Sequence, residues 1–196
     1  MYHTHKTAGL VLAKHPAKEA NSFVIVFTRE LGLIKASAQG AQKITSKLRY
    51  GLQRFSFSTF SFIYGKQSWK ITNAVPIENL YYTLNTNSQK THIMGNICNL
   101  LQRLLTGEEK NEELFDLIIN GFLFLKNYNT NKTGLAHFEF LFVLRILYNL
   151  GYISGSGDLE LLARGQEWTE DYVRSLYEHR KEALSAINRA ILESQL

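Results

Sequence analysis

The first 80 residues carry a hydrophobic pattern typical of β-strands, in which short runs of β-branched and aromatic residues are separated by polar, turn-forming residues. The pattern predicts five strands, over residues 2–15, 21–30, 32–40, 55–65 and 68–77. Five short strands within so few residues suit a small closed barrel better than a sandwich. We therefore expect an N-terminal five-stranded β-barrel.

The predicted fourth strand has an irregular pattern. Its aromatic residues stand two positions apart at Phe55 and Phe57 and then resume at Phe60, so the period-two alternation breaks near Ser58 and Thr59. A change of phase of this kind is typical of a bulge or a sharp bend. We predict a bulge in this strand, which would help to curl the sheet into a barrel.

From about Asn79 the hydrophobic period lengthens to that of α-helices. We expect helices over residues 89–107, 109–128, 135–151 and 168–196. The third is apolar nearly all round, which indicates the buried centre of a helical domain, and Gly151 should end it. Thr169 is the expected N-cap of the fourth. One apolar stripe should run along that last helix: Val173, Leu176, Tyr177, Leu184, Ile187 and Ile191. The predicted fold class is α+β, with a barrel domain over residues 1–79 and an all-α domain over residues 80–196.

Charge is distributed unevenly along the chain. The net charge is +5, yet residues 1–80 contain 11 Lys or Arg against 3 Glu, and the remainder contains 11 against 14 acidic residues. Between Glu30 and Glu78 every charged residue is basic: Lys35, Lys43, Lys47, Arg49, Arg54, Lys66 and Lys70. A run of one sign is typical of a surface that binds a polyanion. An ordinary solvated face would give the same count, so charge alone leaves both interpretations open.

Aromatic residues interleave with these cations. Small five-stranded barrels bind single-stranded nucleic acids through a positive groove with aromatic side chains on which bases stack. Tyr50, beside Arg49 in the longest connection, is the candidate stacking residue. Phe55 and Phe57 are better explained as barrel core.

The sequence contains no G-x-S-x-G, P-loop or H-E-x-x-H motif, so we predict a binding protein without a cofactor rather than an enzyme. His3 and His5 would share a face of the first strand, but zinc needs three or four ligands, so exposed histidines explain them better. Cys98 is expected in the core. The apolar runs are far shorter than the roughly 20 residues of a membrane span, and no secretory signal pattern is present, so we expect a cytoplasmic location.

Several segments of the chain resemble the RecO family of bacterial recombination mediators. In the barrel they are "GLVL" (9–12), "VFTRELGLIKASAQGA" (26–41), "ITSKLRYGLQRF" (44–55) and "AVPIE" (74–78). In the helical half, "FEFLFVLRILYNLGY" (138–152) is similar to a family helix that ends in leucine, glycine and tyrosine.

The resemblance implies an OB-fold followed by a helical domain. It also implies binding of single- and double-stranded DNA, annealing of complementary strands, and loading of recombinase together with RecR and single-strand-binding protein. By position, the DNA-facing cations would be Lys35, Lys43, Lys47, Arg49 and Arg54, to which we add Tyr50, Lys66 and Lys70 as candidates.

The chain departs from the family pattern in two places. Gln39 and Gln42 stand where relatives often carry arginines, which weakens the local positive charge. Many members also have a four-cysteine zinc module after the last family helix, whereas residues 153–168 contain no cysteine, so no zinc is expected. Two alternatives therefore stay open: a protein-docking adaptor with weak DNA affinity, and an OB-fold RNA-binding protein.

Overall fold

The computed structural model describes residues 3–85, 87–154 and 157–193. The chain forms two compact units. The first unit comprises Met1–Thr86 and Leu105–Phe115, and the second comprises Asn87–Leu104 and Asp116–Leu196. The predicted division into domains over residues 1–79 and 80–196 stays a prediction.

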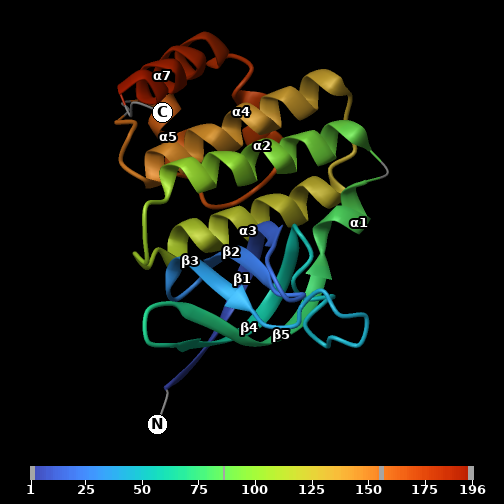
Figure 1. Cartoon of the computed structure of the whole chain (residues 1–196). Helices are drawn as coiled ribbons and strands as arrows, with labels where there is room; N and C mark the ends of the chain where they lie inside the picture. Colours follow the sequence, from blue (N-terminus) through green and yellow to red (C-terminus); the bar gives the residue numbers. More distant parts are fainter. Residues whose placement is uncertain (1–2, 86, 155–156, 194–196) are drawn as a thin grey trace. The chain divides into compact units, whose positions relative to one another are not determined.

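Five strands form the first unit (Figure 1): β1 (Thr4–Pro16), β2 (Ser22–Thr28), β3 (Gly32–Ala38), β4 (Ser56–Tyr64) and β5 (Trp69–Asn79). They close into a barrel in the order β1-β2-β3-β5-β4, and β1 also pairs with β4. All pairs are antiparallel except β3 with β5. This is the five-stranded arrangement of an OB-fold, and the predicted barrel is confirmed.

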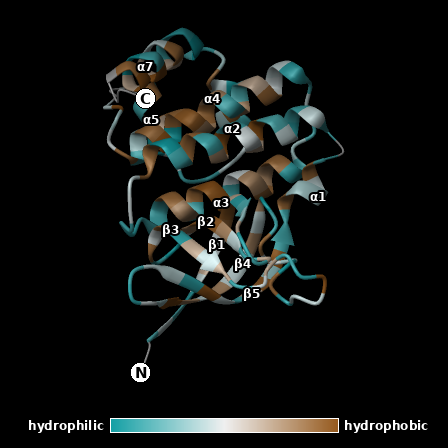
Figure 2. Ribbon diagram, in the orientation of Figure 1, coloured by the Kyte–Doolittle hydropathy of each residue, from teal (hydrophilic) through white to brown (hydrophobic). Residues whose placement is uncertain are grey.

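The barrel interior is filled by apolar side chains at alternate strand positions, because successive residues of a strand point to opposite faces. Figure 2 shows hydrophobic residues running along the strands. The buried cluster contains Val11, Val24, Val26, Ile34, Ala36, Phe60, Phe62 and Ile71. These side chains form the hydrophobic core of the barrel.

The bulge predicted in the fourth strand lies on its neighbour. Alternation continues through β4, where Ser58 is fully buried and donates a hydrogen bond to the Gly51 carbonyl at 3.0 Å. Phe57 lies on the outer face, with its ring centroid 6.3 Å from that of Phe115. The register does shift beside Phe57 and Ser58, but the additional residue, Ile77, belongs to β5. The aromatic pattern was misleading because a small serine occupies an interior position.

Residues 39–55 connect β3 to β4 through consecutive turns rather than a helix. The turns are closed by backbone hydrogen bonds, for example from Ser46 N to Lys43 O at 3.0 Å and from Arg49 N to Ser46 O at 3.2 Å. Ala41 and Leu52 are fully buried in the barrel cluster. The connection is therefore anchored to the barrel at both of its ends.

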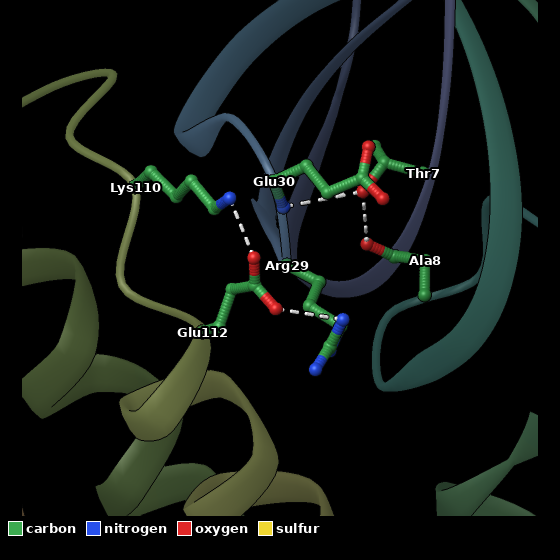
Figure 3. Close-up of polar contacts among 6 residues, drawn as sticks. All are labelled: Thr7, Ala8, Arg29, Glu30, Lys110 and Glu112. Carbon is green, nitrogen blue, oxygen red and sulfur yellow. Dashed lines mark hydrogen bonds and ion pairs between the residues drawn. The ribbon is translucent and has the colours of Figure 1, made fainter.

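The segment 105–115 returns to the barrel and is held there by polar contacts. The Leu33 amide donates to the Gly107 carbonyl at 3.0 Å, and Trp69 Nε1 donates to Glu108 Oε1 at 2.7 Å. Figure 3 shows the ion pair between Arg29 and Glu112, 2.8 Å long. A long return segment therefore belongs to the first unit although it lies between two helices in the sequence.

Seven helices are described: α1 (Leu80–Leu84), α2 (Ser88–Leu104), α3 (Glu112–Asn127), α4 (Lys132–Asn149), α5 (Asp158–Arg164), α6 (Glu170–Ser175) and α7 (Arg180–Glu193). As predicted, α4 is the buried centre of the second unit and packs against α2, α5, α6 and α7. Gly151 follows it with φ of +78°, a left-handed conformation that glycine adopts without steric cost.

The last predicted helix is in fact two helices. Thr169 is the N-cap of α6, as predicted, because its side chain accepts a hydrogen bond from the Tyr172 amide at 3.3 Å. Residues 176–179 then form turns before α7 begins, and Tyr177 is exposed rather than part of an apolar stripe. Leu176 and Ala183 are both buried and seven residues apart, so the sequence keeps a helical phase across the turn and cannot reveal the break.

A fully buried arginine in α4 was missed by the sequence analysis. Arg145 Nε donates to the Leu162 carbonyl at 3.0 Å, and its Nη1 donates to the Glu167 carbonyl at 2.6 Å. Its guanidinium carbon lies 4.5 Å from the centre of the Trp168 ring and 5.3 Å from that of Tyr172. Burial lowers the pKa of Arg145 to about 10. The side chain joins α4 to α5 and to the irregular segment that follows α5.

Candidate nucleic-acid interface

All eight candidate binding residues are exposed at the surface of the first unit. Lys35 lies on β3, Lys66 in the turn between β4 and β5, and Lys70 on β5; the connection between β3 and β4 carries the other five, which are Lys43, Lys47, Arg49, Tyr50 and Arg54.

The connection presents its cations because some of its apolar residues, Ala41, Leu48 and Leu52, face the barrel. Leu48 packs against the core cluster and Leu52 is buried within it. Lys47 and Arg49, on either side of Leu48, are left exposed. The sequence of this segment, with apolar residues between basic ones, therefore produces a loop with an anchored side and a cationic side.

Three of the cations belong to the β3–β5 side of the barrel. Ser37 pairs with Lys70 in the parallel ladder, and Lys35, two residues before Ser37, lies on the same outer face of β3. The Lys70 side chain packs against Gly65, in the turn that also carries Lys66. This side of the barrel and the adjoining turn form one basic surface.

Other cations gather beside β1. Burial, together with the positive charge of Arg49, lowers the pKa of Lys14, which places these two basic groups close to one another. Arg54 Nε donates to the Leu12 carbonyl at 3.2 Å, and its guanidinium carbon lies 4.5 Å from the centre of the Phe55 ring. Arg54 thus also fastens the connection to β1. Lys14 was missed because it stands outside the stretch between Glu30 and Glu78.

The described residues include no ion pair with a carboxylate for six of these cations, namely Lys35, Lys43, Lys47, Arg49, Lys66 and Lys70. Their charges are available to a partner rather than neutralised within the protein. Such a surface attracts polyanions, and its attraction weakens as salt concentration rises.

Exposed aromatic residues accompany the cations, among them Tyr64 at the end of β4, which is 50% exposed. Tyr50 is 66% exposed on the connection. Phe23, which the sequence analysis missed, is 40% exposed on the outer face of β2, between His15 of β1 and Ser37 of β3 in the strand register. No sequence signal separated Phe23 from the core, because residues 23–27 are all apolar and both faces of β2 look alike. Phe55 is buried, but Phe57, which was expected in the barrel core, is half-buried on the outer face of β4 because the interior positions of this strand begin with Ser56 and Ser58.

The two glutamines at arginine positions have different surroundings. The Gln42 amide donates to the carbonyl of Asn21 and, at 3.3 Å, to that of Ala17, so it holds the turn between β1 and β2 against the connection. The exposed Gln39 side chain makes no hydrogen bond within the described residues. Gln42 is therefore a structural tie, whereas the Gln39 amide is available to a ligand.

The described residues offer neither a metal site nor a membrane span. Within them, no group of three or more His, Cys, Asp or Glu side chains is arranged to hold a metal ion. No helix among those described has the length and apolar character needed to cross a membrane.

A closed five-stranded barrel of this strand order, with an exposed basic surface, defines the class of the protein as an OB-fold protein. The family comparison is more specific. Residues 1–80 match the family described as Recombination protein O N terminal, and residues 86–153 match Recombination protein O C terminal. The chain belongs to the RecO family.

Individual relatives agree with this assignment. The chain is 32% identical over 147 residues to the DNA repair protein RecO of Clostridium novyi, covering 75% of this chain and 56% of that protein. It is 29% identical over 113 residues to the DNA repair protein RecO of Alkaliphilus metalliredigens, covering 58% of this chain and 46% of that protein. It is also 29% identical over 148 residues to the DNA repair protein RecO of Heliobacterium modesticaldum, covering 76% of this chain and 52% of that protein. The chain spans about half the length of the curated relatives it matches.

Proposed function

We propose that this chain acts in DNA repair and homologous recombination as a non-enzymatic mediator that binds single- and double-stranded DNA through its barrel. Its role would include annealing complementary strands and, with RecR and single-strand-binding protein, helping to load recombinase. Membership of the RecO family supports the repair role. The helical unit is the proposed docking region for the protein partners.

One observation carries the DNA-binding part of the proposal. Six exposed cations of the barrel unit lack a carboxylate partner within the described residues, and exposed aromatic rings accompany them. Cations bind phosphates without regard to base sequence, and aromatic rings stack on unpaired bases. The combination suits a protein that must hold single strands of any sequence.

The DNA-binding proposal is tested by fluorescence anisotropy with a labelled single strand over a range of salt concentrations. The logarithm of the binding constant should fall linearly with the logarithm of the salt concentration, by about 0.7 for each phosphate contact. Replacing Lys47 and Arg49 together by alanine should make that slope about 1.4 less steep, because two contacts are lost.

The matched control is the double variant K181A/R189A, which removes the same charges from exposed positions of α7. It should bind DNA as the wild type does. Equal losses of DNA affinity in the two double variants would show that only the net charge of the chain matters. A wild-type affinity that does not change with salt concentration would contradict phosphate binding altogether.

A protein-docking adaptor with weak DNA affinity is the second candidate function. It is favoured by the uncharged Gln39 and by Gln42, whose amide is engaged within the barrel unit. An adaptor would retain RecR or single-strand-binding protein in a pull-down while failing to shift DNA in a gel. Tighter binding to RNA than to DNA of the same sequence would instead favour an OB-fold RNA-binding protein.

A further inference from the structure

A groove of about 630 Å³ opens on the barrel beside the parallel pair of strands. The β3–β5 ladder contains only two residue pairs and ends at Ser37 and Lys70. Gln39 and Thr72, two residues further along, line the groove beyond that end. The volume lies within the range of about 300–1,000 Å³ that is usual for small-molecule sites, which is large enough for one nucleotide.

The groove combines apolar walls with polar groups at its rim. Leu48 and Ile71 supply apolar surface, while Asn21, Ser37 and Lys70 supply hydrogen-bonding groups. Asn21 Oδ1 accepts a hydrogen bond from the Gly40 amide at 2.8 Å, which fixes this side chain and directs its NH₂ group away from that contact. A planar nucleobase combines the same two kinds of surface, because its faces are apolar and its edge carries hydrogen-bonding groups.

Gln39 is the groove residue with the most unused hydrogen-bonding capacity. Its amide has two N–H donors and a carbonyl acceptor, and none of them is engaged within the described residues. Lys70, on the adjacent strand, has no ion pair there either. An amide can form hydrogen bonds with the edge of a base, and an unpaired cation beside it can bind the phosphate of the same nucleotide.

We propose that this groove receives one unstacked base of a bound single strand and that the Gln39 amide reads its edge, with Lys70 on the neighbouring phosphate. Adenine is the expected base, because an amide side chain pairs bidentately with its 6-amino group and the adjacent ring nitrogen. Phe23 lies on the next strand opposite Ser37 and provides a platform for the following base. This inference rests on the proposed function, since it adds base selectivity to a surface that otherwise contacts phosphates.

The test compares the affinities of 12-nucleotide strands of dA, dT and dC at constant salt, measured by anisotropy with the whole chain. The wild type should bind dA at least about fivefold more tightly than dC, the lower limit expected for a bidentate amide–adenine pair. Gln39→Leu should reduce that ratio to within twofold and leave the salt slope unchanged, because the cations are retained. The matched variant Gln166→Leu, at an exposed position of the second unit, should keep the wild-type ratio.

A second ligand separates base reading from the strong stacking of adenine strands. Purine deoxyribonucleoside lacks the 6-amino group but still stacks, so a strand of it should lose the advantage of dA with the wild type. With Gln39→Leu, the two strands should bind equally.

The possible outcomes separate this inference from the function on which it rests. Salt-dependent binding without a base preference, or a preference that survives Gln39→Leu, would overturn the base-reading groove and leave DNA binding by the barrel intact. No salt-dependent binding to any of the strands would refute both.

Discussion

Replacement of Arg145 by methionine should destabilise the second unit, because this arginine is fully buried and joins α4 to α5 and to the segment that follows α5. Methionine keeps an unbranched side chain of similar length but removes both hydrogen bonds to main-chain carbonyls. The carbonyls of Leu162 and Glu167 would then lose their charged donor.

The magnitude follows from opposing contributions. Each hydrogen bond from a charged donor contributes about 1.5–3 kcal/mol. The contact with the Trp168 ring adds about 1 kcal/mol. Against them stands the cost of burying the charge: the lowering of the pKa of Arg145 from 12.5 to about 10 corresponds to roughly 3 kcal/mol. The net loss is about 1–4 kcal/mol, and the two carbonyls left without a donor move it toward the upper limit.

Urea unfolding followed by circular dichroism at 222 nm measures this loss, because the helical signal comes mainly from the second unit. With a slope of about 2 kcal/mol per molar urea, the midpoint should fall by roughly 0.5–2 M. Arg164→Met is the control, since Arg164 is exposed at the end of α5 and should change stability by no more than about 0.5 kcal/mol. The reasoning would be refuted if Arg145→Met unfolded at the wild-type midpoint.

Three further predictions concern stacking, pH and backbone conformation. Phe23→Ala should weaken single-stranded DNA binding by about 1–3 kcal/mol in anisotropy titrations. It should affect duplex binding less, since only unpaired bases can stack on the ring. Equal losses of affinity for both ligands would count against stacking. The pKa of His137 is lowered by burial and by the charge of Arg180, so the unfolded chain takes up this proton first and stability should fall as the pH drops below 6.5. Urea midpoints at pH 7.5 and 5.5 check this, and His137→Gln should reduce the difference between them. Gly151→Ala should lower the free energy of unfolding by about 1 kcal/mol, because alanine is strained at the φ of +78°. Gly95→Ala, inside α2 and with equally open space around it, should raise the free energy of unfolding by about 0.5–1 kcal/mol. Thermal unfolding measures both changes, and changes of the same sign would contradict the conformational argument.

The sequence was most informative where local periodicity controls structure. The five strands and the buried helix α4 follow directly from alternation with period two and from a helix that is apolar nearly all round. The cap at Thr169 and the end of α4 at Gly151 were also predictable, because each depends on a residue and its immediate neighbours. The exposed cations were found because the run of like charges is continuous in sequence.

The errors have a common physical cause. The bulge was assigned to the wrong strand because Ser58, a small polar residue, fills a position inside the barrel. The break between α6 and α7 was missed because the turn preserves the spacing of buried residues. Lys14, Phe23 and Arg145 were overlooked because their surroundings come from other strands or helices, which no local window contains.

The sequence by itself therefore determined the barrel, the helical half and the sign of the charge, since these depend on residues close together in the chain. Only the tertiary structure decided that Gln42 is tied to the turn between β1 and β2 while Gln39 lines an open groove beside Lys70. The two glutamines are three residues apart and chemically identical. Their difference arises from contacts with residues about twenty to thirty positions away, which strand pairing brings together and sequence spacing does not encode.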